Sequence, residues 1–96
     1  MEAKVKRYTS FDAMSISATF PSGANFKLRV NRNGETLELA FSNDMPTLRE
    51  QMKTFNAWIK RESDKHKDWT KLFDILEGYC KKSNTGKELI SILEKA

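Results

Sequence analysis

The chain has 96 residues, of which 39% are hydrophobic and 31% are charged, and its formal net charge is +4. This length and composition predict one globular domain over residues 1–96 and exclude both a disordered chain and a two-domain protein. The single cysteine cannot form a disulfide within the chain, and no segment approaches the ~20 apolar residues of a membrane helix. We therefore expect a cytoplasmic protein with no secretory signal and no membrane contact.

Three segments in the first half alternate apolar and polar residues with the period of two that half-buried strands show. They predict strands at about residues 13–20, 25–31 and 35–41. Short runs of turn residues, 21–23 and 33–34, separate these segments. The expected sheet is therefore an antiparallel meander.

The two turns also predict the register of the strands. Residues 21–23 fit a three-residue loop with Gly23 in the left-handed conformation, and Asn33-Gly34 fits the centre of a type I′ turn. In this register Arg29 meets Glu38 on the polar face as an opposite-charge pair. The apolar pairs share the other face and are Met14–Val30, Ile16–Leu28, Ala18–Phe26, Val30–Leu37, Leu28–Leu39 and Phe26–Phe41.

Apolar residues in the second half recur at spacings of three and four, which is typical of amphipathic helices. We expect helices at about residues 47–62, 67–82 and 86–95. Thr47 with Glu50, and Thr85 with Glu88, have the spacing of a capping box and mark two helix starts. Residues 61–68 contain no apolar side chain, so we expect the first two helices to be separated there.

The apolar face of the sheet must be buried, and the helices are the cover that the chain offers. The predicted fold is α+β, with a three-stranded antiparallel meander packed on two or three C-terminal helices. Residues 1–11, which include Val5, Tyr8 and Phe11, fit either an edge strand or a flexible arm.

The residue types of a catalytic site are too few, so we expect a non-enzymatic protein without metal or cofactor. The only histidine, His66, falls in the expected loop between helices, where an exposed surface residue is expected. Cys80 lies on the apolar face of the second helix, which favours a small buried thiol over a nucleophile. One cysteine and one histidine are a poor start for the ~4 ligands of a zinc site.

Apolar and aromatic side chains beyond the needs of a small core favour docking on another protein. The last two helices are apolar over more than one stripe, and a basic zone from Lys60 to Lys71 adjoins two tryptophans. Helices that cover one another's sides would use the same surface without a partner. The expected protein-binding residues are Trp58, Lys60, Arg61, Lys65, Lys67, Trp69 and Tyr79.

This combination favours a small regulatory protein, in the manner of phage-type modulators or inhibitors of a host nuclease or defence complex. That comparison is an association from size and composition and depends on no motif. A homodimer through the last two helices would use the same apolar surface.

A DNA-binding module is the alternative function. The polar face of the expected sheet carries basic side chains, as in proteins that read a groove with strands. An ordinary solvated face is the competing explanation, because Glu38 can neutralise Arg29 and the face shows no aromatic residue for stacking. The expected DNA contacts are Lys27, Arg29 and Arg32, with Lys4, Lys6 and Arg7 as a phosphate-contacting arm.

Overall fold

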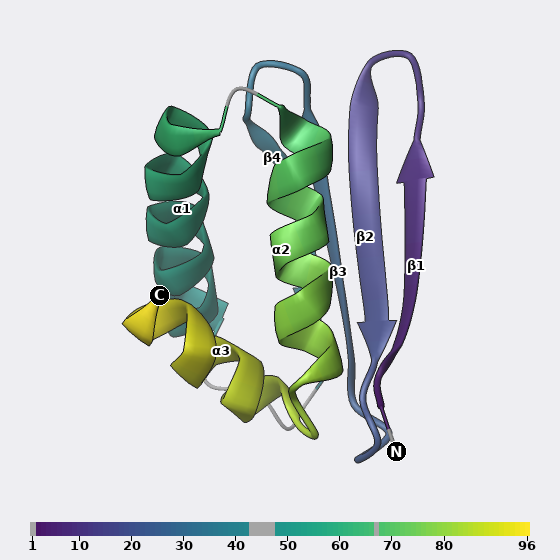
Figure 1. Cartoon of the computed structure of the whole chain (residues 1–96). Coiled ribbons are helices and arrows are strands. Elements are labelled where there is room, and N and C mark those ends of the chain that lie inside the picture. Colours follow the sequence, from purple (N-terminus) through teal and green to yellow (C-terminus); the bar gives the residue numbers. More distant parts are fainter. Residues whose placement is uncertain (1, 43–47, 67) are drawn as a thin grey trace.

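The computed structural model describes residues 2–42, 48–66 and 68–96. In chain order the elements are β1 Lys4–Thr9, β2 Ala13–Thr19, β3 Asn25–Asn31, β4 Thr36–Phe41, α1 Leu48–Lys65, α2 Trp69–Lys81 and α3 Gly86–Lys95 (Figure 1). The strands form one antiparallel sheet in the order β1-β2-β3-β4. The predicted α+β class is confirmed, and the sheet has four strands where the sequence predicted three. Among the described helices, none has the length and apolarity to span a bilayer.

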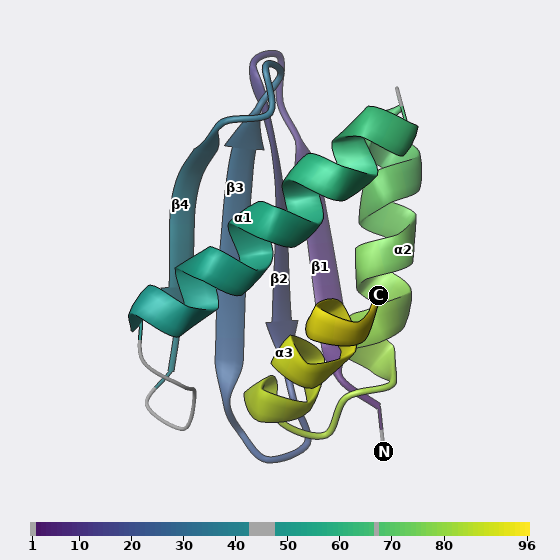
Figure 2. The ribbon, with the colours of Figure 1, turned by 90° about the vertical axis from the view of Figure 1, so that its left-hand side faces the viewer.

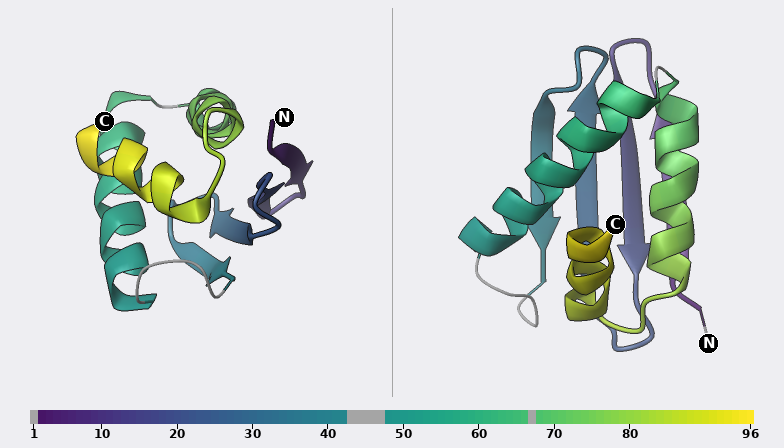
Figure 3. Two further views of the ribbon diagram at one scale, coloured as in Figure 1. Left: turned by 90° about the horizontal axis from the view of Figure 1, so that it is seen from below. Right: turned by 60° about the vertical axis from the view of Figure 1, so that its left-hand side comes forward.

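All three helices lie on the same face of the sheet (Figures 2 and 3). In Figure 2, α1 crosses obliquely in front of the strands, and α2 lies on the side of β1. Helix α3 packs against both α1 and α2. None of the described helices covers the opposite face, which we call the outer face.

Of the two alternatives for residues 1–11, the edge strand is the one that the structure contains. Strand β1 pairs with β2 from Lys4 opposite Thr19 to Thr9 opposite Met14. The strand escaped the pattern analysis because its helix-facing side carries Val5 and then the charged Arg7. The helix-facing side of β1 therefore shows no run of alternating apolar residues that would predict a strand.

The core lies between the sheet and the helices. Its largest fully buried side chains include Phe26 of β3, Phe55 and Trp58 of α1, and Phe73 of α2. Burying a side chain of this size contributes about 1.5–3 kcal/mol relative to leaving it exposed. The wide apolar surfaces of the helices are thus largely buried against the sheet and against one another.

The register between β2 and β3 is confirmed at every predicted apolar pair. Phe20 and Ala24 close the connecting loop, with the Phe20 amide donating to the Ala24 carbonyl at 2.8 Å. Gly23 has a φ of 91°, the left-handed conformation that the three-residue loop requires.

Between β3 and β4 the predicted register is confirmed except near the turn. Leu28 pairs with Leu39 and Phe26 with Phe41, but Val30 pairs with Thr36, so the predicted Val30–Leu37 pair is wrong.

The cause of this error is the turn itself, which has a three-residue loop closed by the Asn31 amide donating to Glu35 at 3.0 Å. Of the expected type I′ pair, only Gly34 has a positive φ, at 83°. The longer loop shifts the register by one residue, and an irregularity beside Leu37 restores it. Leu37 is left 52% exposed.

The helices begin and end close to their expected positions. Helix α1 continues to Lys65, so the break between the first two helices is shorter than expected. Asp68 caps α2 by accepting a hydrogen bond from the Thr70 amide at 2.9 Å. The predicted cap of α3 is confirmed, since Thr85 accepts from the Glu88 amide at 3.1 Å, while the Glu88 carboxylate accepts from the Asn84 amide at 2.6 Å. The corresponding prediction at Thr47 lies outside the described residues.

Replacing Gly34 by alanine is predicted to destabilise the fold more than the same change at Gly23. Both glycines have positive φ, which costs a non-glycine residue about 1–2 kcal/mol. A Cβ on Gly34 would also lie 3.0 Å from Cζ2 of Trp69, whereas a Cβ on Gly23 meets nothing within 4 Å. Urea denaturation of the two variants would measure the difference. Equal losses of unfolding free energy would contradict a tight contact between the hairpin and Trp69.

Candidate functional site

The three aromatic residues expected at a docking surface are used inside the fold. Trp58 is fully buried, and its ring lies edge-on to Tyr79 with 6.1 Å between the centroids. Trp69 is half-buried, edge-on to Phe73, and lies against Gly34. The expectation for Trp58 is therefore corrected: a partner cannot touch it in this fold. Trp69 and Tyr79 present only part of their rings.

The basic zone expected beside these rings belongs mostly to helix α1. Arg61 donates from Nη2 to carbonyl groups in the last turn of α3, at 3.4 and 3.1 Å. Lys65 lies 3.8 Å from a carboxylate oxygen of Glu62. Lys60 is exposed, and Lys67 lies outside the described residues. The zone is thus no single basic loop, because Arg61 caps a neighbouring helix and Lys65 pairs within its own helix.

His66 is more enclosed than expected. Its side chain is 25% exposed, and its Nε2 lies 3.9 Å from Oε2 of Glu62. It lines a hollow of about 650 Å³ together with Arg32 and Lys60. Glu62 lies one helical turn before His66, and its carboxylate is almost buried. Arg32 and His66 at this hollow thus each lie close to a protein partner.

Cys80 is fully buried, as the sequence predicted. Burial, followed by the negative charge of Glu77, raises the pKa of the thiol to about 12. The thiolate needed for nucleophilic or redox chemistry is therefore scarce near neutral pH. Over the residues that the structure describes, no three His, Cys, Asp or Glu side chains gather as a metal site would require.

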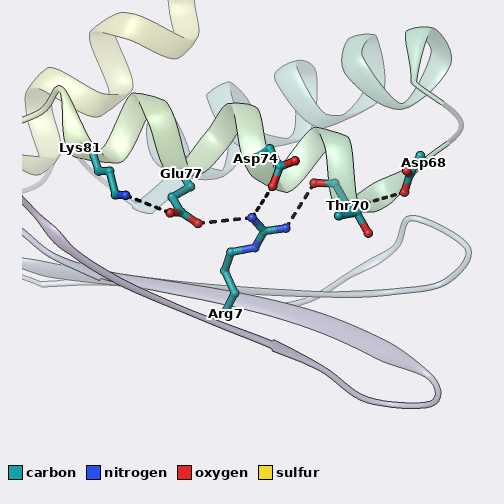
Figure 4. A network of polar contacts seen from close by, with 6 residues as sticks. All are labelled: Arg7, Asp68, Thr70, Asp74, Glu77 and Lys81. Atoms are coloured by element: carbon teal, nitrogen blue, oxygen red, sulfur yellow. Dashed lines mark hydrogen bonds and ion pairs between the residues drawn. The ribbon is translucent and has the colours of Figure 1, made fainter.

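Arg7 does not belong to a phosphate-contacting arm, because it points toward the helices. Its position in β1 is opposite the buried Ile16 of β2. As Figure 4 shows, its guanidinium reaches helix α2, donating to Asp74 at 2.5 Å and to Glu77 at 3.3 Å. It also donates to the Thr70 carbonyl at 3.2 Å. Arg7 thus joins the edge strand to α2 across most of the length of the chain.

The pKa values of this cluster reflect the same contacts. Partial burial acts to lower the pKa of the Arg7 guanidinium, but Asp74 and Glu77 outweigh it, and the pKa is raised. The pKa of the Glu77 carboxyl is lowered, first by the hydrogen bond from Lys81 and also by Arg7, although burial opposes this. The ionised forms are therefore favoured in the folded protein.

Because Arg7 fixes β1, the alternate residues of this strand are held on the outer face. The side chains of that face form rows across the sheet. From β1 to β4 the rows are Tyr8–Ser15–Arg29–Glu38, Lys6–Ser17–Lys27–Ala40 and Lys4–Thr19–Asn25. Four cations thus come together on β1 and β3, with the short hydroxyl side chains of β2 between them.

The negative charge on the outer face is small. Within the described strands, Glu38 is the carboxylate that faces the same way, and its Oε1 lies 3.7 Å from Nζ of Lys27. The predicted alignment of Arg29 with Glu38 is confirmed, but the ion pair of Glu38 is diagonal, to Lys27. Both partners are about half exposed, so the pair contributes ~0–1 kcal/mol and leaves the face positive.

Tyr8 is an outer-face residue that the sequence analysis did not assign. Its side chain is 67% exposed. It borders a hollow of about 290 Å³ that is also lined by Ser15, Lys27 and Arg29. The signal was present as Lys4, Lys6 and Tyr8 at every second position, but it becomes meaningful only when these residues form a strand.

Arg32 is not part of the outer face. Its Nε donates to the Phe11 carbonyl in the loop between β1 and β2, and its Cζ lies 6.0 Å from the centre of the Phe11 ring. Of the six expected DNA contacts, Arg7 is turned toward the helices, and Arg32 is exposed but lies apart from the others, against Phe11. The structure brings the other four together: Lys4, Lys6, Lys27 and Arg29.

A scan against protein-family models found no match to this chain, and searches of curated proteins and of solved structures found none either.

Replacing Arg7 by methionine is predicted to lower the free energy of unfolding by about 1–2 kcal/mol, because two carboxylates lose their shared partner. Lys6→Met is the matched control, since Lys6 lies on the same strand, is exposed, and faces away from α2. Unfolding by urea or by heat, and not by a guanidinium salt, would compare the stabilities of the two variants. A similar loss in both variants would show that Arg7 does not anchor the strand.

The same variant is predicted to alter the acid sensitivity of the fold. A carboxyl whose folded pKa is lowered stabilises the protein above its usual pKa of 4.5, and this contribution is lost as the pH falls through the folded value. Arg7→Met should therefore lose less stability than the parent protein as the pH falls below about 5. Parallel pH profiles would contradict the coupling of Glu77 to Arg7.

Proposed function

We propose that the protein binds nucleic acid through the outer face of its sheet. The observation that carries this proposal is the gathering of Lys4, Lys6, Lys27 and Arg29 on a face that the three helices leave uncovered. Phosphate groups are the commonest partner of such a positive surface, and contacts to them dominate the affinity of nucleic-acid-binding proteins.

The spacing of these cations suits a polyanion. Lys6 and Lys27 lie in one row on either side of β2, so their backbones are two strand intervals apart, about 9–10 Å. Lys4 and Arg29 extend the positive area along β1 and β3 in opposite directions. Between them Ser17 and Thr19 supply hydroxyl groups that can donate to phosphate oxygens. One polyanion lying across the sheet can therefore contact all four cations together.

Removing charge from this face is predicted to weaken nucleic-acid binding without weakening the fold. The double variant Lys27→Ala/Arg29→Ala should bind roughly tenfold less tightly near physiological salt, because two phosphate contacts are lost. Fluorescence anisotropy with labelled oligonucleotides over a salt series would measure this. The slope of log affinity against log salt should be roughly −3 for the parent protein and about half that for the variant.

The matched control is Lys71→Ala/Lys87→Ala, which removes the same charge from exposed positions on α2 and α3. This control should bind almost as the parent protein does. Equal weakening of both double variants would show that only net charge matters. A parent protein that binds no oligonucleotide at low salt would sink the proposal.

Docking on another protein is a second candidate function, and a different surface now favours it. Phe11 is 92% exposed in the loop between β1 and β2, and Leu37 is 52% exposed in β4, beside the turn between β3 and β4. Both line a hollow of about 430 Å³, with Asp12 and Arg32 at its border. Exposed apolar side chains around a hollow with polar neighbours are typical of protein interfaces. A regulatory or inhibitory role would use this end of the sheet.

A protein partner that binds there is predicted to be lost in the double variant Phe11→Ser/Leu37→Ser. Capture of the tagged protein from lysate, before and after nuclease treatment, would separate this function from the first. A stoichiometric protein that survives nuclease and requires Phe11 and Leu37 would support docking. Retention that is insensitive to both substitutions would contradict docking at this surface.

A further inference from the structure

We propose that the outer face selects single-stranded over double-stranded nucleic acid, and that the exposed ring of Tyr8 stacks on one unpaired base. This inference rests on the proposed function and specifies its substrate. Four observations carry it: the width of the sheet, the exposure of Tyr8, the hollow beside it, and the cations around that hollow.

The width of the sheet does not suit a duplex. The four strands span three intervals of about 4.8 Å, so the outer strands are roughly 14 Å apart before side chains are added. The major groove of B-DNA is about 12 Å wide and admits a helix or a two-stranded ribbon. The cations lie on β1 and β3, and therefore spread over the face instead of lining one narrow ribbon. A flexible single strand can follow this broad surface, whereas a stiff duplex can touch only part of it.

Tyr8 provides an exposed aromatic ring on which an unpaired base, but not a paired one, can stack. Stacking on an aromatic ring requires a base whose face is free, and single strands offer such bases along their whole length. The Tyr8 side chain is 67% exposed, although most large apolar and aromatic side chains of this protein are buried. Its strand is held in place from the opposite side by Arg7, so the ring is presented by a fixed backbone.

The hollow beside Tyr8 has the size of a small ligand group. It measures about 290 Å³, which is at the lower end of the ~300–1,000 Å³ of pockets that take drug-sized molecules. Four residues of the outer face line it, and one of them, Ser15, the neighbour of Tyr8 in the same row, has a short side chain. Thr9, Ser10, Ala13 and Met14 complete its lining. One base fits this description, with polar groups at its edge.

The cations stand where the flanking phosphates would lie. Lys27 and Arg29 line the hollow, and Lys6 is two residues from Tyr8 on the same face, about 7 Å along the strand. A base on the Tyr8 ring therefore places its own backbone between cations on β1 and β3. Because the contacts to phosphate and the stacking are independent of base identity, we expect little sequence preference.

The test compares labelled oligo-dT of 12 nucleotides with a blunt 12-base-pair duplex by fluorescence anisotropy at one salt concentration. The parent protein should bind the single strand at least tenfold more tightly. Tyr8→Ala should lose roughly tenfold or more of the single-strand affinity and little of the duplex affinity. Tyr8→Phe keeps the ring and should bind as the parent protein does. Phe11→Ala is the matched control, because it removes an exposed aromatic ring that lines a different hollow.

A second pair of variants tests the hollow without touching Tyr8. Ser15→Val fills the hollow with a side chain that strands tolerate and should reduce single-strand binding. Thr19→Val, on the same strand and face but outside the hollow, should not. Circular dichroism confirms that each variant folds, and the Ser15 pair decides the outcome if Tyr8→Ala does not fold.

The outcomes separate the two proposals. Equal binding of single strand and duplex, with no effect of Tyr8→Ala or Ser15→Val, would overturn the single-strand inference while leaving nucleic-acid binding intact. Selective single-strand binding that ignores both substitutions would overturn the role of Tyr8. Binding of neither oligonucleotide would remove the proposed function and this inference together.

Discussion

The fold depends on a single constraint: one face of the sheet is apolar and must be covered, and all three helices cover it. Phe26, Leu28 and Val30 of β3 are each at most 2% exposed beneath these helices. Because every helix follows the sheet in the sequence and packs on the same side, the other face has no cover from the described elements. Residues on that face do not pack in the core, so their side chains can be suited to binding a ligand. Four cations and one exposed aromatic ring occupy it.

The exception on the covered face is Arg7, and it explains how a polar edge strand stays attached. Strand β1 offers little apolar area to the core, because Val5 is its main contribution. The guanidinium of Arg7 replaces that contribution with directed contacts to two carboxylates and one carbonyl of α2. Charge-assisted hydrogen bonds of this kind are stronger than neutral ones. The consequence for function is that Lys4, Lys6 and Tyr8 are held as part of the sheet.

The sequence predicted those parts of the fold in which local patterns and cross-strand pairing agree. The pairing of β2 with β3, the Gly23 loop and the Thr85 cap followed from alternation and turn chemistry. Strand β1 did not, because its contacts to α2 join residues about 70 positions apart, and no local pattern encodes them. Leu37 was misplaced because Asn-Gly fits either a two-residue or a three-residue loop.

The candidate site was predicted in part for the same reason. The strand pattern placed Lys27 and Arg29 correctly on the polar face of the sheet. The position of Tyr8 on that face depends on β1, the strand that the sequence did not clearly predict. Helical periodicity shows how wide an apolar surface is and not what covers it. Trp58 was therefore taken as a contact residue, although the sheet and α2 enclose it.

The irregularity at Leu37 has a further consequence for how this protein behaves at high concentration. Strand β4 is the edge of the sheet opposite β1, and a regular edge strand offers free amide and carbonyl groups to the strand of another molecule. The extra residue disrupts the regular spacing of those groups and twists that end of the strand. A bulge on an edge strand is one of the ways in which natural sheets hinder pairing with the strands of other molecules. The displaced residue that exposes an apolar side chain therefore also makes this end of β4 a poorer template for such pairing.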